Sequence, residues 1–207
     1  MTRITVIRHS QLEEPFDNYD ELGYIQLDGL ATGTIQPRIS RNTANLIEQS
    51  HYLDEKFDVI LHSPSSRAME TAEEIVKMKV LNQIKLLSID EIDEIKFTIS
   101  NLITKSEYKK LGLQPLRDRF YKAIGENQAG IEPLESIYKR IQVFEDILKD
   151  MKDKNILVIS HGFFMKYIKS YFYQESLGKL PEKKVLQRLV EKSNDRYDYL
   201  SGFSVTI

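Results

Sequence analysis

Two short runs of β-branched residues, far apart in the chain, each end in a histidine. Residues 6–10 read VIRHS and residues 158–162 read VISHG, which places His9 and His161 directly after the apolar runs. Such runs are typical of strands that are buried in a parallel sheet. In an open α/β sheet, ligands bind in the crevice beyond the carboxyl ends of the strands. The two fragments therefore predict an α/β fold that brings both histidines to one ligand-binding edge.

A third fragment adds a second arginine to this edge. Residues 61–68 read LHSPSSRA and follow a predicted strand at 57–61, so Arg67 lies close behind that strand, as Arg8 lies beside His9. The planar fork of a guanidinium group can bind two phosphate oxygens at once. These residue types favour a site for an anionic, phosphorylated ligand. Each fragment taken alone also fits a buried structural histidine or a surface salt bridge.

The composition is that of an ordinary globular protein. The chain has 207 residues, of which 41% are hydrophobic and 29% charged, and this length suits one α/β domain. A net charge of −2 argues against a protein that binds nucleic acid by broad phosphate neutralisation. No apolar run approaches the ~18 residues of a membrane span, so we expect no membrane partner. Without cysteine, the chain has no disulfide, no thiolate zinc site and no cysteine nucleophile.

The hydrophobic pattern predicts a single-domain three-layer sandwich, in which helices cover both faces of a mostly parallel sheet. The strand at 155–159 is the most apolar and is expected at the centre of the sheet. The first strand begins almost at Met1, so we expect no signal peptide and a cytoplasmic protein. The other predicted elements are strands at 3–7, 57–61 and 202–207, helices at 39–53, 64–79, 134–151 and from 163, and a polar loop at 11–37. Ser40 and Ser63 are the expected N-caps of the first two helices, with Pro64 at the first helical position.

The three fragments resemble the motifs of the histidine phosphatase superfamily, which is related to cofactor-dependent phosphoglycerate mutase. Residues 8–10 (RHS) resemble the Arg-His-Gly signature of that family, and residues 63–72 (SPSSRAMETA) are similar to its Ser-Pro-x-x-Arg-Ala-x-x-Thr-Ala segment. Residues 158–162 resemble the strand that carries its second histidine. The resemblance covers residues 4 to about 170, with the motifs in the family's order. Ser10 departs from the family glycine, which would allow a close approach of the backbone to phosphate.

The resemblance implies a role for four of these residues. His9 would be the nucleophile that forms a covalent phosphohistidine. His161 would contact the phosphoryl oxygens from the other side, and Arg8 and Arg67 would bind the phosphate. Arg67 also falls in the first turn of its predicted helix, where the backbone amides favour anions.

The remaining histidines do not indicate a metal site. The four histidines of the chain include no i, i+3 or i, i+4 pair, and no carboxylate cluster accompanies them at ligand spacing. We therefore expect no metal and no cofactor. His51 and His62 are predicted to be surface residues or to support the site from behind.

The family also uses a glutamate as the acid that protonates the leaving oxygen. It lies in a segment resembling Leu-x-Glu-Ile-x-Phe-Gly, and residues 89–97 (IDEIDEIKF) fit that pattern in two registers. The register over residues 92–97 makes Glu94 the acid and reproduces the aromatic position. The rival register makes Glu91 the acid. We choose Glu94, although Thr98 replaces the family's glycine.

Two further segments complete the resemblance. Residues 132–140 match the spacing of a Gly-Glu-Ser…Arg segment of the family. Residues 98–130 look like a cap or insertion within the domain of residues 1–207, although a solvated helical face is the simpler explanation of their charges. The basic residues of this region are Lys105, Lys109, Lys110, Arg117, Arg119 and Lys122.

From these features we expect a phosphatase that hydrolyses phosphomonoesters through phosphohistidine, without a metal. Its substrate would be a small phosphorylated metabolite or a phosphoprotein. Two alternatives stay open: a mutase of the phosphoglycerate mutase type that uses the same intermediate, and a phosphate-sensing module that has lost turnover. The stretch after His9 (QLE at 11–13) lacks the glutamate-rich sequence usual in the mutases, which favours the phosphatase.

Overall fold

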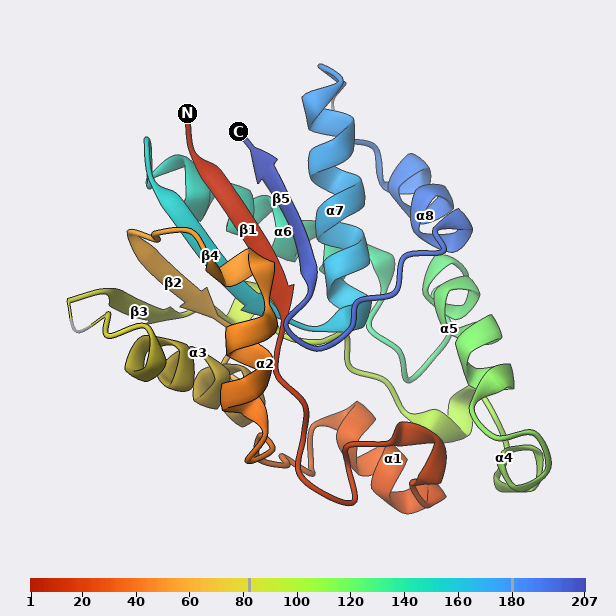
Figure 1. Cartoon of the computed structure of the whole chain (residues 1–207). Coiled ribbons are helices and arrows are strands. Elements are labelled where there is room, and N and C mark those ends of the chain that lie inside the picture. The colour runs from red at the N-terminus through yellow and green to blue at the C-terminus, as the bar shows by residue number, and fades with distance from the viewer. Residues whose placement is uncertain (82, 180) are drawn as a thin grey trace.

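The protein folds around a five-stranded sheet whose strand order is β3-β2-β4-β1-β5. The computed structural model describes residues 1–81, 83–179 and 181–207. The strands are β1 (Arg3–Arg8), β2 (Val59–His62), β3 (Lys85–Ser88), β4 (Asn155–Ser160) and β5 (Gly202–Thr206). The first four are parallel, and β5 joins the edge antiparallel to β1. As predicted, β4, the most apolar strand, lies at the centre of the sheet (Figure 1). The C-terminal strand, β5, lies at an edge.

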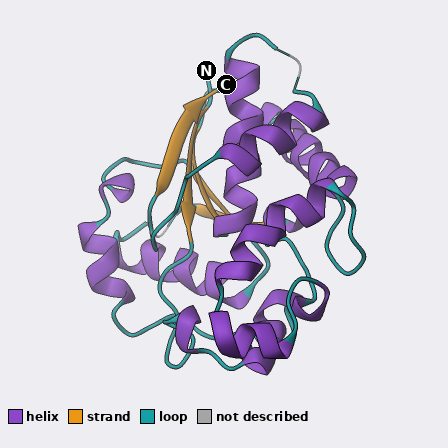
Figure 2. Ribbon diagram, turned by 90° about the vertical axis from the view of Figure 1, so that its right-hand side faces the viewer, coloured by secondary structure: helices purple, strands orange, loops and turns teal. Residues whose placement is uncertain are grey.

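Alternate residues of the strands point to opposite faces of the sheet, and helices cover both faces. Ile60 and Leu157 pack with α2 (Thr43–Gln49) and α3 (Ser66–Met78) in one core cluster. Leu61 and Val158 belong to the other cluster. The second face is covered by α6 (Leu134–Lys149) and α7 (Gly162–Ser176). Seen close to edge-on in Figure 2, the strands have helices on either side, which confirms the three-layer α/β architecture.

The remaining helices lie beyond these layers. Figure 1 shows α1 and α4 past the carboxyl ends of the strands, and α5 and α8 outside α7. Their bounds are α1 (Tyr24–Thr32), α4 (Lys105–Leu111), α5 (Gln114–Gly125) and α8 (Lys183–Lys192). Short 3-10 helices are η1 (Tyr19–Glu21), η2 (His51–Leu53), η3 (Asp90–Ile92) and η4 (Ile99–Asn101). Among the helices of the described chain, none is long and apolar enough to cross a bilayer.

The register of the central strands brings the sequence fragments together. Arg8 is the partner of Ser160 across β1 and β4, and His62 is the partner of Ile159 across β2 and β4. The residues that follow these positions, His9, His161 and Ser63, therefore leave the sheet at one edge. Beyond the carboxyl ends of the strands lie α1 and the N-termini of α3 and α7, the helices that follow β2 and β4 in the chain.

Several predicted element boundaries are wrong. The helix expected over residues 39–53 is α2 followed by η2, and its N-cap is Asn42, because Ile39 instead forms a β-bridge with Leu12. The helix expected from Pro64 begins at Ser66, because the extended Ser65 occupies the N-cap position. The loop expected over residues 11–37 contains η1 and α1.

Candidate active site

His9 lies directly after β1, and its ring is held by its own backbone neighbour. Its Nδ1 lies 2.7 Å from the carbonyl oxygen of Ser10. A carbonyl oxygen only accepts, so Nδ1 carries the proton and Nε2 keeps its lone pair. Burial, together with the positive charges of Arg67 and Arg8, holds the pKa of His9 well below its ordinary value. A neutral imidazole with an unprotonated Nε2 is the form that can act as a nucleophile.

Ser10, the departure from the family glycine, fits the loop without strain. Its hydroxyl pairs with the hydroxyl of Thr43 at 2.8 Å, and its backbone N–H donates to the hydroxyl of Thr71 at 3.0 Å. Its φ is not positive, so the position does not require glycine. Ser10 therefore anchors the His9 loop to α2 through its side chain and to α3 through its backbone N–H.

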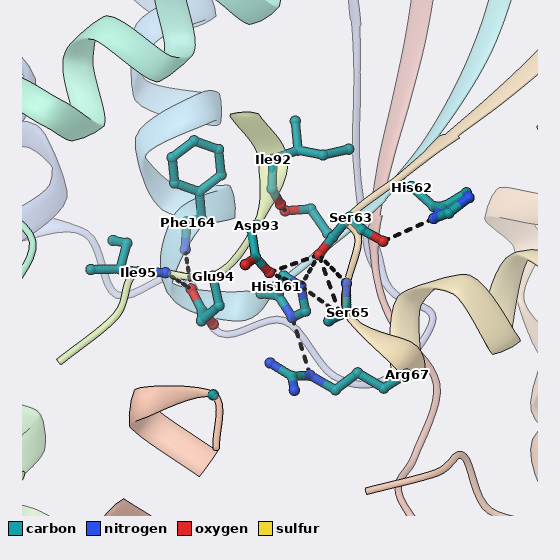
Figure 3. Close-up of polar contacts among 12 residues, drawn as sticks. His62, Ser63, Ser65, Arg67, Ile92, Asp93, Glu94, Ile95, His161 and Phe164 are labelled. Atoms are coloured by element: carbon teal, nitrogen blue, oxygen red, sulfur yellow. Dashed lines mark hydrogen bonds and ion pairs between the residues drawn. The ribbon is translucent and has the colours of Figure 1, made fainter. Parts of the chain in front are cut away.

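Arg67 is the second residue of α3 and is 8% exposed. Its Nε donates to Nδ1 of His161 at 3.3 Å (Figure 3). Its Nη1 is buried and has no hydrogen-bond partner among the described residues. A buried guanidinium N–H without a partner is costly, and an anionic ligand oxygen would satisfy it.

Arg8 is held by aromatic residues that the sequence analysis did not single out. Its Nη1 donates to the carbonyl of Tyr197 at 2.9 Å, and its Nη2 donates to the hydroxyl of Tyr19 at 3.3 Å. The guanidinium lies over the ring of Tyr199, 4.2 Å from its centroid. These contacts tie the end of β1 to η1 and to the segment before β5. No motif marked them, although two tyrosines in residues 197–199 (YDY) were the available signal.

His161 lies directly after β4, at the N-cap of α7, and is fully buried. Its ring centroid is 5.2 Å from that of His9. Its Nε2 lies 2.8 Å from the hydroxyl of Ser63 and 3.2 Å from that of Ser65. Both ring nitrogens therefore have protein partners. The expected contact of His161 with phosphoryl oxygens stays a prediction.

The side chain of Glu94 lies against the N-terminus of α7. Its carboxylate accepts the backbone N–H groups of Ile95 and Phe164 at 3.0 Å and of Phe163 at 3.3 Å. Burial raises the pKa of Glu94 above its ordinary value, although these N–H groups and the charge of Arg67 act in the other direction. A carboxyl group that keeps its proton to higher pH is suited to act as a general acid.

Glu91, the alternative acid, belongs to η3 and is held differently. Nε of Arg140 donates to the backbone carbonyl of Glu91 at 3.1 Å, and Arg140 also forms a 2.6 Å ion pair with Glu132. Glu94 contributes to the lining of the large pocket, whereas Glu91 is not among the described residues that do so. The geometry therefore favours the register that selects Glu94.

The pocket itself has a volume of about 1280 Å³ and joins the strand ends to the outer helices. Arg8, His9, Arg67 and Glu94 all line it. The surrounding wall comes from α1, α5, α7, α8 and the segment 193–198, and includes Leu27, Leu116, Tyr121, Phe163, Lys166 and Arg188. Four of the five predicted site residues thus share one cavity. The fifth, His161, is buried behind it and accepts a hydrogen bond from Arg67.

The two other histidines do not line this pocket in the part of the chain that the structure describes. His51 is exposed in η2. His62 is buried at the end of β2, with its Nδ1 2.8 Å from the carbonyl of Ser63. It repeats the ring anchoring of His9 but not its access to the cavity.

The fold and this pocket define an α/β protein whose candidate site lies beyond the carboxyl ends of parallel strands, where open α/β sheets bind their ligands. A family model, the histidine phosphatase superfamily (branch 1), matches residues 4–189. The chain belongs to this superfamily, as its motifs indicated. No curated protein matches the chain.

Solved structures share the fold at low sequence identity. YhfR of Bacillus stearothermophilus superposes with a TM-score of 0.63 at 17% identity, covering 96% of this chain and 87% of its own. The alpha-ribazole phosphatase of Shigella flexneri gives 0.57 at 19% identity, with 96% and 87% covered. A phosphoglycerate mutase of Bacillus anthracis gives 0.54 at 22% identity, with 87% and 83% covered. These likenesses establish the fold.

Proposed function

We propose that this protein is a phosphomonoester hydrolase that works through a covalent phosphohistidine on His9. One observation carries the proposal: His9, whose Nε2 is unprotonated, lines one cavity with Glu94 and with Arg67, whose buried Nη1 has no partner within the described chain. A nucleophile, an oxyanion donor and an acid are the three groups that phosphoryl transfer from an ester requires.

The reaction proceeds in two steps. His9 Nε2 attacks phosphorus, the P–O bond to the alcohol breaks, and Glu94 gives its proton to the departing oxygen. Glu94, now ionised, then takes a proton from water as the water attacks the phosphohistidine, which releases phosphate and restores both groups. Arg8 and Arg67 stabilise the charge on the phosphoryl oxygens throughout. His9 itself is the nucleophile, so the chemistry needs no metal.

The outer helices select the leaving group. The segment 98–130 caps the pocket. This role is supported by α5, which contributes Leu116, Tyr121 and Lys122 to the pocket wall. The size of the cavity suits a small phosphorylated metabolite better than it suits a bare phosphate ion. The name of the alpha-ribazole phosphatase, a structural neighbour, also points to a small phosphorylated substrate. A cytoplasmic location stays a prediction.

Steady-state release of phosphate tests the proposal. The unmodified protein is expected to hydrolyse p-nitrophenyl phosphate and one or more phosphorylated metabolites, and His9→Ala is expected to abolish turnover. His62→Gln is the matched control, because His62 is also a buried strand-end histidine with the same Nδ1 contact but lies outside the pocket. Turnover that requires a bisphosphorylated primer would identify a mutase instead, and ligand binding without turnover would identify a sensing module.

A further inference from the structure

Asp93, the residue before Glu94, ends a chain of contacts that leads to Arg67. The hydroxyl of Ser63 donates to Oδ1 of Asp93 at 2.8 Å and lies 2.8 Å from Nε2 of His161. On the other side of the ring, Arg67 donates to Nδ1 of His161 at 3.3 Å. Figure 3 shows the successive contacts, which run from Asp93 through Ser63 and His161 to Arg67. The resemblance of the sequence assigned no role to Asp93.

The direction of each hydrogen bond follows from what the groups can donate. An ionised carboxylate only accepts, so the single hydroxyl proton of Ser63 is directed to Asp93. The Ser63 oxygen must then accept from His161, and Oδ1 of Asp93 itself lies 3.5 Å from the same ring nitrogen, so the imidazole proton is placed on Nε2. The Nδ1 that remains is a bare acceptor, and this is the form that the Nε–H group of Arg67 requires. Contacts on both sides of the ring therefore specify the same tautomer.

The backbone around Asp93 is fixed from two sides. Arg140 of α6 donates through Nη2 to the carbonyl of Asp93. The hydroxyl of Ser160, at the end of β4, donates to the carbonyl of Ile92 at 2.7 Å. Oδ2 of Asp93 lies 3.5 Å from Nζ of Lys96, so its second oxygen also faces a cation. A carboxylate anchored in this way can hold a hydroxyl in one orientation.

We propose that Asp93 is a positioning residue that acts through Ser63 and His161 to aim Arg67 into the pocket. With Nε engaged by His161, the guanidinium plane is fixed, and Nη1, which has no hydrogen-bond partner among the described residues, is free to bind a phosphoryl oxygen. His161 thereby serves the phosphate site by orienting Arg67. The inference rests on the proposed function for the identity of the anion, but the tautomer of His161 does not depend on turnover.

The test is the tautomer of His161, read from its ¹⁵N chemical shifts in the full-length protein at neutral pH. The unmodified protein is expected to show the proton on Nε2. In Asp93→Asn, Lys96 favours the amide oxygen on its own side and turns the amide nitrogen to Ser63. Ser63 then donates its hydroxyl proton to Nε2 of His161 instead of accepting from it. The imidazole proton moves to Nδ1, and the Nε–H group of Arg67 loses its acceptor. Asp90→Asn, an exposed neighbour in η3, is the control that leaves the tautomer unchanged.

Binding of inorganic phosphate supplies a second readout. If Arg67 loses its orientation, the dissociation constant of phosphate is expected to rise about tenfold in Asp93→Asn, the size of one charged hydrogen bond. Ser63→Ala is expected to raise the dissociation constant of phosphate to a similar degree. The double variant is expected to bind phosphate no more weakly than either single variant, because all three variants break the same chain of contacts.

Three results would overturn the inference: a proton on Nδ1 in the unmodified protein, an unchanged tautomer in a folded Asp93→Asn, or additive losses in the double variant. These outcomes are separate from the fate of the proposed function. A protein that binds phosphate, changes tautomer as described and hydrolyses no ester would retain the positioning role of Asp93 and refute the phosphatase.

Discussion

The carboxylate of Glu94 accepts the backbone N–H of Phe164 at 3.0 Å, in the first turn of the helix that begins directly after His161. Oxygen acceptors at this position satisfy the unpaired amides of α7 and lie near the positive end of its dipole. Burial nevertheless outweighs these contacts and raises the pKa of Glu94. The same helix start therefore holds the second histidine and the proposed acid.

If Glu94 protonates the leaving oxygen, its removal will harm substrates with poor leaving groups most. Glu94→Gln is expected to lose about 10²–10⁴-fold in kcat on alkyl phosphates, the usual range for a positioned acid. The loss on p-nitrophenyl phosphate will be much smaller, because that phenolate departs largely without a proton. Paired rate measurements on the two substrate classes make this comparison.

Glu91→Gln is the matched control for this experiment. Glu91 is three residues earlier in the same segment, and its carboxylate does not line the described pocket, so we expect little change on either substrate. If the two variants exchange behaviours, the acid is Glu91 and the register that selected Glu94 is wrong.

The pH profile of kcat/KM should be shifted at both ends. Burial and the charges of Arg67 and Arg8 lower the pKa of His9, so it stays neutral and nucleophilic at pH values well below 6.5. The raised pKa of Glu94 keeps the acid protonated above the ordinary range of a carboxyl group, and activity falls only as pH rises through that pKa. Glu94→Gln should remove this basic limb. An acid limb near pH 6.5 in the unmodified protein would contradict the account of His9.

Arg67→Lys tests the fork geometry of the phosphate site. Lysine keeps the charge but replaces the planar fork, in which separate nitrogens contact His161 and a phosphoryl oxygen, with a single nitrogen on a flexible chain. The inhibition constant of phosphate or vanadate is expected to rise about 10- to 100-fold, the loss of one or two charged hydrogen bonds. Arg38→Lys is the control, since Arg38 is exposed, pairs with Glu70 and is not among the described residues that line the pocket. Equal inhibition constants for Arg67→Lys and the unmodified protein would refute this role.

Ser10→Gly restores the family residue and separates the active enzyme from a sensing module. The hydroxyl of Ser10 bonds to Thr43 and the backbone needs no positive φ, so serine is compatible with catalysis. We expect turnover within about twofold of the unmodified protein and a loss of about 1 kcal/mol in unfolding free energy, measured by urea denaturation. A large gain in turnover would show that Ser10 suppresses activity.

The sequence predicted the core of this molecule because its strongest patterns are local. The β-branched runs of β1, β2 and β4 identify these strands, and the positions of His9, Arg67 and His161 just after them predict that the three residues meet at one end of the sheet. Parallel pairing makes that step geometric, since the carboxyl ends of parallel strands meet. The single domain of 1–207 and its cap at 98–130 are less directly constrained and stay predictions.

Other parts escaped prediction for physical reasons. β3 (KLLS) contains no β-branched residue, and as an edge strand it has no buried residue, so no apolar run distinguished it from a loop. α1 has no apolar stripe that would distinguish it from the turn-rich sequence around it. The contacts of Arg8 with Tyr19 and Tyr199 join segments far apart in the chain, and no spacing rule relates them. Asp93 was hidden for a similar reason, because its partner Ser63 comes from another strand end.

The most direct test of the account is to trap the intermediate. The protein would be mixed briefly with a rapidly hydrolysed aryl phosphate, quenched in alkali, digested and analysed by mass spectrometry. We predict one acid-labile phosphoryl group, on His9, which is absent from His9→Ala and retained in His62→Gln. A phosphoryl group on any other residue, or normal turnover by His9→Ala, would contradict the proposed mechanism.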